Sequence, residues 1–96
     1  MKPWKKEHTL DQIAEGVAKL YELHSQALRS RERTRSLSAG RCLFTLAAKA
    51  HGYRGIEIAG YLDKEPPSIS AYDRKRDLFT GDLTALQGHL TRGNKN

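Results

Sequence analysis

RGIEIAGYLDKEPPSISAYDRK, residues 54–75, contains two short helical patterns on either side of a proline pair. Apolar residues spaced by three share one face of the first pattern: Ile56, Ala59 and Leu62. The proline pair must end this helix, because successive prolines fit a helix only within its first turn. A second helix is therefore predicted to begin near Pro66 or Pro67. The stretch as a whole predicts a helix-turn-helix.

The second helix of this pair carries few residues suited to a core. Its clear core candidates are Ile69, Tyr72 and Phe79. Short side chains at the front let a helix approach the base edges of DNA, and basic side chains behind them meet phosphates. An ordinary surface helix explains the same pattern, so both interpretations stay open at this point. The residues that a recognition helix would use are Ser68, Ser70, Ala71, Arg74 and Lys75.

Positive charge is concentrated in two segments of the chain. The net charge is +6 over 96 residues, which suits an anionic partner such as DNA, RNA or an acidic membrane surface. The first segment contains Arg29, Arg31, Arg33, Arg35 and Arg41, and the second contains Lys64, Arg74, Lys75 and Arg76. Guanidinium groups are suited to phosphates and to the minor groove. Two basic segments that meet in the fold would form a nucleic-acid footprint, whereas a solvated connector is the alternative for residues 29–40.

The first helix is signalled by a capping box, with Thr9 as N-cap and Gln12 three residues later. Residues at spacings of three and four follow it: Leu10, Ile13, Val17, Leu20, His24 and Leu28. They predict a helix over about 10–24, with a looser continuation to Leu28. Its expected role is to close the core.

The rest of the chain predicts a loop and two more helices. Residues 29–40 lack apolar periodicity and are expected to form a loop, with Ser38 able to cap the next element. The apolar stretch RCLFTLAAKAHGY predicts a central helix over about 39–51 that ends at Gly52. Leucines at spacings of three and four predict a short helix over 82–90.

These elements predict an all-α fold, a small bundle of about five to six helices that contains the helix-turn-helix. Residues 1–8 are expected to form a basic extension and residues 9–79 the domain. Residues 80–96 are expected to form a short C-terminal helix and a disordered tail.

Several function classes are excluded by what the sequence lacks. The single cysteine, Cys42, rules out an internal disulfide and zinc patterns that need two thiolates, and its apolar neighbours predict a buried thiol. The four histidines are scattered, so no metal or other cofactor is expected. No Walker A loop, GxSxG elbow or HExxH occurs, and we expect no enzymatic activity.

No apolar run of about 18 residues is present, and the basic start MKPWKKEH leads into no secretory signal. We therefore expect a cytoplasmic, nucleoid-associated protein without a membrane partner.

Three stretches, taken in order, resemble a known domain: TLDQIAEGVAKLYEL, LRSRERTRSLSAGRCLFTLAAK and IEIAGYLDKEPPSISAYDRK. They resemble the C-terminal DNA-binding domain of the bacterial replication initiator DnaA. They look even more like the related domain of REP-associated tyrosine transposases, which also has a TrpR-like helix-turn-helix. The similarity covers about residues 9–78, and LRSRERTRSLSAGR is its most specific part. It implies sequence-specific binding of double-stranded DNA, with the helix-turn-helix in the major groove and a basic loop in the minor groove.

The resemblance also implies roles for individual residues. Arg33 falls at the minor-groove arginine, with Arg35 and Arg41 at neighbouring basic positions, and Arg31 belongs to the same candidate set. Lys49 falls where a lysine meets phosphate. The positions in or near the helix entry that faces the bases are Lys64, Pro67, Ser68 and Ala71.

The sequence departs from the initiator family at the start of the recognition helix. That family carries a signature of the Asp-His-Thr-Thr type there, and this chain has Glu-Pro-Pro-Ser at 65–68. The target is therefore expected to differ from the initiator's own box. The similarity includes neither the initiator's ATPase module nor the transposases' nuclease domain, so a nuclease or transposase domain outside this sequence is an expected partner.

Two other functions remain alternatives to duplex DNA binding. One is an RNA-binding helical adaptor, although the few aromatic residues argue against stacking on single strands. The other is a protein-interaction module whose basic loop docks on an acidic partner.

Overall fold

The first helix begins at the predicted capping box. In the computed structural model, which describes residues 8–93, the Thr9 hydroxyl accepts a hydrogen bond from the Gln12 N–H at 3.1 Å, and Gln12 Oε1 accepts one from the Thr9 N–H at 2.9 Å. Helix α1 spans Leu10–Tyr21 and ends before the predicted residue 24. The reason is that Glu22 takes a left-handed conformation, with φ of 58°, and turns the chain into a separate 3-10 helix, η1, at Ser25–Arg29.

Helix α2, Arg35–Ala50, begins earlier than the predicted residue 39. The cap is Thr34 and not Ser38, since the Thr34 hydroxyl accepts the Leu37 N–H at 3.1 Å. The C-terminal end matches the prediction: Gly52 has a φ of 95°, which allows the next residue to bond back to the last helical turn. Residues 40–48 of α2 are all buried, so this helix is the centre of the fold.

The two helices predicted around the proline pair both form. Helix α3 spans Gly55–Leu62, and helix α4 spans Pro66–Asp73 with its prolines in the first turn, as predicted. Asp63 ends α3 in a left-handed conformation with φ of 59°. Helix α4 packs on α2 and α3 through Ile69, which is 2% exposed. A turn of three residues, 63–65, thus separates the two helices of a helix-turn-helix.

The C-terminal part is helical over a longer stretch than predicted. A 3-10 helix, η2, spans Arg76–Phe79, and helix α5 spans Thr80–Gly93, which includes the predicted 82–90. Leu86 and Leu90 are buried against α1, where Gly16 allows the two helices to approach closely. The tail predicted to be disordered covered residues 91–96, of which 91–93 belong to this helix; residues 94–96, like 1–7 of the predicted extension, lie outside the described residues.

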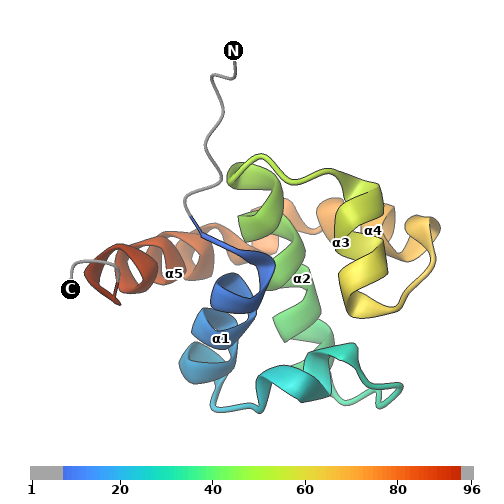
Figure 1. The fold of residues 1–96 in the computed structure, drawn as a ribbon, viewed down its shortest axis with the longest axis horizontal. Coiled ribbons are helices and arrows are strands. Elements are labelled where there is room, and N and C mark those ends of the chain that lie inside the picture. Colours follow the sequence, from blue (N-terminus) through green and yellow to red (C-terminus); the bar gives the residue numbers. More distant parts are fainter. Residues whose placement is uncertain (1–7, 94–96) are drawn as a thin grey trace.

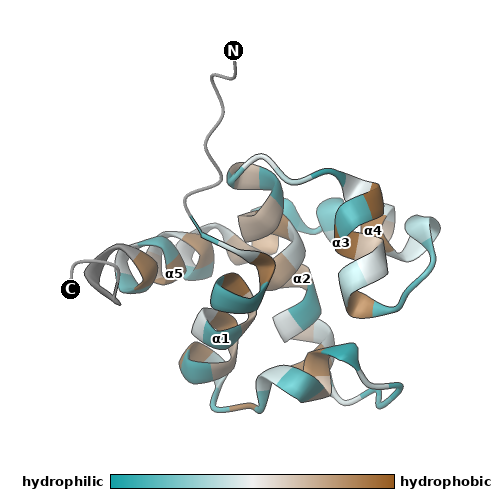
Figure 2. Cartoon of the chain, viewed as in Figure 1, coloured by the Kyte–Doolittle hydropathy of each residue, from teal (hydrophilic) through white to brown (hydrophobic). Residues whose placement is uncertain are grey.

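Helices α1, α2 and α5 pack together on one side, and α3 and α4 lie across α2 on the other (Figure 1). Apolar and polar positions alternate along the helices (Figure 2), and the buried core takes apolar residues from α1, α2, α3, α4 and α5. The described residues contain helices and turns but no strand, which confirms the predicted all-α bundle. None of the described helices combines the length and apolar character needed to cross a bilayer.

Candidate nucleic-acid interface

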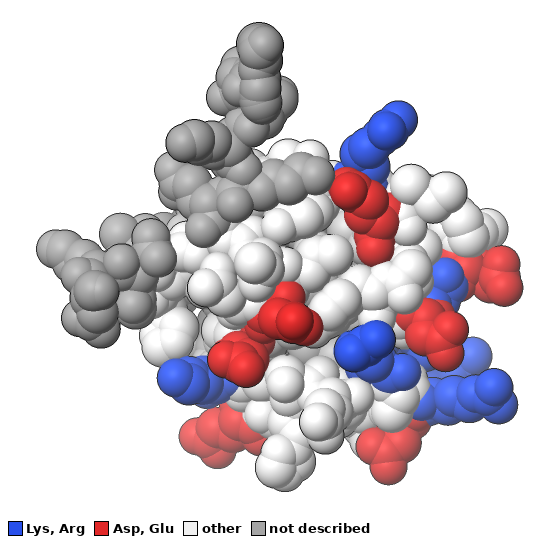
Figure 3. Space-filling model, in the orientation of Figure 1, with Lys and Arg blue, Asp and Glu red and all other residues white. Residues whose placement is uncertain are grey.

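The five arginines of residues 29–41 divide into two groups. Three of them are exposed in the segment that follows η1 or at the start of α2: Arg31, Arg33 and Arg35. The first two belong to the loop of residues 30–34, here called the arginine loop, and Arg35 begins α2. Lys and Arg side chains gather at the lower right of Figure 3, where Figure 1 places the chain between η1 and α2. The other two donate to backbone carbonyls of the domain: Arg41, which is buried, and Arg29, which is exposed.

Arg41 corrects the sequence-based expectation most clearly, because its side chain lies inside the protein at 2% exposure. Its Nε donates to the Leu28 carbonyl at 2.9 Å in a buried hydrogen bond. Its Nη atoms donate to the carbonyl oxygens of Glu32 at 2.8 Å, Ser30 at 2.8 Å and Ala27 at 3.2 Å. Four of the five guanidinium donors are thus used by backbone oxygens around the arginine loop. Arg41 holds this loop and is not placed to contact a ligand at the surface.

Arg29 connects η1 to the C-terminal end of α3. Its Nε donates to the Tyr61 carbonyl at 2.9 Å, and its guanidinium lies 4.7 Å from the centre of the Tyr61 ring. The Tyr61 ring also stacks on the Phe44 ring, with centroids 5.2 Å apart, and its hydroxyl donates to Asp11 at 2.7 Å. Tyr61 therefore connects α3 with η1, α2 and α1, directly before the turn of the helix-turn-helix.

Lys64, in the turn itself, makes the second connection to the arginine loop. Its Nζ donates to the Ser30 carbonyl at 3.0 Å, and this oxygen also accepts from Arg41. The pKa of Lys64 is lowered, first by burial of the ammonium group and then by the positive charges of Arg41 and Arg33. Lys64 was expected near the helix entry that faces bases; it lies there, half-buried, with its ammonium turned to the loop.

The charge of the arginine loop also acts on one residue of α4. Burial raises the pKa of the Tyr72 phenol, and the nearby charges of Arg41 and Arg33 act against this rise. Arg33 thus acts on Lys64 and on Tyr72, which are in the turn and in α4. Together with the bond from Lys64 to the Ser30 carbonyl, this shows that the first basic segment meets Lys64 of the second.

One face of α4 is open to solvent. Pro67, Ser70, Ala71 and Arg74 are all exposed, and their spacing of i, i+3, i+4 and i+7 places them along one side of the helix. Every side chain before Arg74 on this face is short. Ser68 is half-buried and lies off this face. The face can approach a second molecule closely, with one guanidinium at its end.

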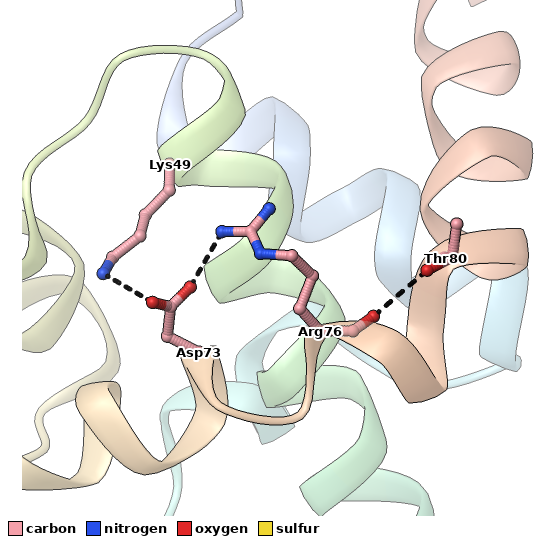
Figure 4. A network of polar contacts seen from close by, with 4 residues as sticks. All are labelled: Lys49, Asp73, Arg76 and Thr80. Atoms are coloured by element: carbon pink, nitrogen blue, oxygen red, sulfur yellow. Dashed lines mark hydrogen bonds and ion pairs between the residues drawn. The ribbon is translucent and has the colours of Figure 1, made fainter.

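The remaining two candidate residues have different surroundings. Lys75 is exposed just after α4, near enough to Cys42 for its charge to act on the thiol, whose pKa is nevertheless raised by burial. Lys49 Nζ lies 3.5 Å from Asp73 Oδ2, while the other Asp73 oxygen accepts from Arg76 at 3.0 Å. Figure 4 shows Asp73 between the two cations. This pair engages the charge of Lys49 within the domain, and a phosphate there would have to compete with Asp73.

The burial of Arg41 is signalled in the sequence by its position in an apolar stripe and not by its charge. Leu37, Phe44 and Ala48 are all buried on α2, and Arg41 lies in the same stripe at spacings of four and three. A charged residue inside an apolar stripe predicts a buried, hydrogen-bonded group. The bond from Arg29 to the Tyr61 carbonyl had no comparable signal, because it depends on a backbone oxygen of a distant helix.

No protein-family model, curated protein or solved structure matches the chain. The geometry described above is therefore the basis for any statement about function.

Proposed function

We propose that this domain binds double-stranded DNA in a sequence-dependent way. The observation that carries the proposal is the contact of the arginine loop with the turn that leads into α4, where Lys64 Nζ donates to the Ser30 carbonyl at 3.0 Å. A helix with short exposed side chains fits the major groove, and exposed arginines next to it fit the adjacent minor groove. This is also the arrangement implied by the resemblance to the initiator and transposase domains.

In the proposed complex the exposed residues contact different parts of the DNA. Arg31, Arg33 and Arg35 enter the minor groove or contact its phosphates, and Arg74 and Lys75 contact phosphates beside the major groove. The open face of α4, from Pro67 to Ala71, meets the base edges. The methyl group of Ala71 and the ring of Pro67 are suited to thymine methyl groups rather than to the hydrogen-bonding edge of guanine.

The test is a salt-dependent titration of the domain with labelled duplex DNA, using sites selected from a random library. Replacing both Arg33 and Arg35 by alanine should reduce the slope of log K against log salt by about 2, since each lost phosphate contact contributes about 0.9. The matched control removes two exposed cations elsewhere, Lys19 and Arg54. We expect this control to bind with nearly the parent's slope.

Two results would overturn the proposal. One is parent-like affinity of the Arg33→Ala, Arg35→Ala variant. The other is equal or tighter binding of an RNA duplex of the same sequence, because the narrow major groove of A-form RNA does not admit α4. The second result would favour the RNA-binding alternative.

A further inference from the structure

The arginine loop and the helix-turn-helix are joined by three cationic side chains that donate to backbone carbonyls of the domain. Arg41 in α2 donates to four backbone carbonyls of η1 and the loop. Lys64 reaches from the turn to the Ser30 carbonyl at 3.0 Å. Arg29 reaches from the base of the loop to the Tyr61 carbonyl at 2.9 Å. These contacts cross between η1 or the loop and the helices α2 and α3, and none of them depends on a ligand.

We propose that Lys64 and Arg29 are positioning residues, which lock the arginine loop to the helix-turn-helix so that the two reading elements have one fixed spacing. The proposal rests on the proposed DNA-binding function and adds to it a limit on which sites can bind. A loop held in place before binding costs less to order at the interface. A fixed spacing also requires the minor-groove and major-groove parts of a site to lie at one separation.

Backbone carbonyls are the acceptors in all three contacts, which matters for this role. A carbonyl accepts a bond without neutralising the cation, so the same groups that hold the loop keep their positive charge next to the exposed arginines. The lowered pKa of Lys64 reports this repulsion between neighbouring cations, after the larger effect of burial. Repulsion inside the loop would spread Arg31 and Arg33 away from the domain in the absence of DNA. The hydrogen bonds of Lys64 and Arg29 oppose that spreading.

Lys64→Met tests the lock directly, since it keeps the aliphatic stem and removes only the ammonium donor. Lys19→Met is the matched control, because Lys19 is an exposed lysine in the last turn of α1. In the free protein, we expect backbone ¹⁵N relaxation to show increased mobility at residues 30–33 in Lys64→Met and parent-like mobility in Lys19→Met. Arg29→Met should increase mobility in the same residues.

DNA binding provides the second readout. If the loop occupies its bound position about a tenth of the time once released, affinity falls about tenfold. The salt slope stays at the parent's value, because a positioning residue contacts no phosphate. One base pair inserted between the two parts of a selected site shifts them by about 3.4 Å. That insertion should weaken the parent strongly and Lys64→Met several-fold less, because a released loop can follow the shifted groove.

Each result decides the question. Unchanged loop mobility in both Lys64→Met and Arg29→Met overturns the lock, as does a salt slope reduced by about 1 in Lys64→Met, which would make Lys64 a phosphate contact. An equal loss on insertion for parent and variant also overturns it. If the parent binds no duplex, the proposed function fails, whereas the relaxation measurement on free protein still decides whether the lock exists.

Discussion

Arg41→Met should destabilise the domain although it removes a charge from the interior. The bond from Nε to the Leu28 carbonyl is buried, so its loss leaves an oxygen without a partner, at a cost of about 1–3 kcal/mol. The other three carbonyls, of Ala27, Ser30 and Glu32, are partly buried and can turn towards water. Together they add roughly 1–2 kcal/mol, and the avoided desolvation of the guanidinium offsets part of the sum. We expect a net loss of about 2–4 kcal/mol.

Urea unfolding followed by circular dichroism measures this loss. A domain of 96 residues has a free energy of unfolding of about 5–14 kcal/mol, so the variant should still fold. With an m-value of about 1.5 kcal/mol/M, the midpoint should fall by about 1.5–2.5 M urea at unchanged slope. Arg33→Met, an exposed arginine of the same loop, is the control and should unfold at the parent's midpoint.

A midpoint of Arg41→Met within about 0.5 M urea of the parent's, at the same m-value, would contradict this prediction. Equal destabilisation of Arg33→Met and Arg41→Met would contradict it too, because the effect would then come from total charge and not from the carbonyl contacts.

Three further predictions follow from other parts of the molecule. Replacing thymine by uracil in a selected site removes only methyl groups. Each methyl that packs on Ala71 contributes about 0.8 kcal/mol, so its loss should weaken binding about fourfold in an anisotropy titration. Equal affinity of the two sites would mean that α4 faces another part of the DNA. The pKa values of Tyr21 and Tyr61 are raised, first by burial and then by hydrogen bonds to Asp82 and Asp11. Above about pH 10 the unfolded phenols lose protons that the native ones keep, so the free energy of unfolding should fall as pH rises. Urea unfolding at pH 8 and 10.5 checks this, with a smaller fall in Tyr61→Phe, and pH-independent stability would contradict it. Gly88→Ala adds a Cβ that meets nothing within 4 Å in α5 and should stabilise by about 0.5–1 kcal/mol in the same urea assay, whereas a destabilised variant would contradict a continuous α5 at that position.

Local signals were the part of the fold that the sequence could predict. The capping box at Thr9, the glycine at 52 and the proline pair at 66–67 each act through their own backbone neighbours, and each ends or begins a helix where predicted. The predicted start of α2 was wrong for a related reason. Thr34 and Ser38 are both good caps, and the first turn after Thr34 faces solvent except for Leu37, so apolar periodicity could not choose between them.

The sequence showed two basic segments that could meet in the fold, but not which of their cations are held by the domain. A count of charge treats Arg33 and Arg41 alike, although the first is exposed and the second is buried among backbone carbonyls. Hydrogen bonds to backbone oxygens depend on tertiary geometry and leave little trace in residue types. This is why the contact residues within a basic segment are harder to predict than the segment itself.

The acceptors of Arg41 link the stability of the domain to its proposed function. Had a carboxylate held this guanidinium, the pair would be neutral and the surface above it would lose one positive charge. Among the residues described, carbonyl dipoles hold Arg41 instead, and its charge still acts on Lys64 and Tyr72. A phosphate near the loop would therefore be attracted by Arg41 without touching it, over a distance at which a buried charge is screened less by salt. Arg41→Met should thus weaken DNA binding even at urea-free, fully folded conditions, through both the released loop and the lost field.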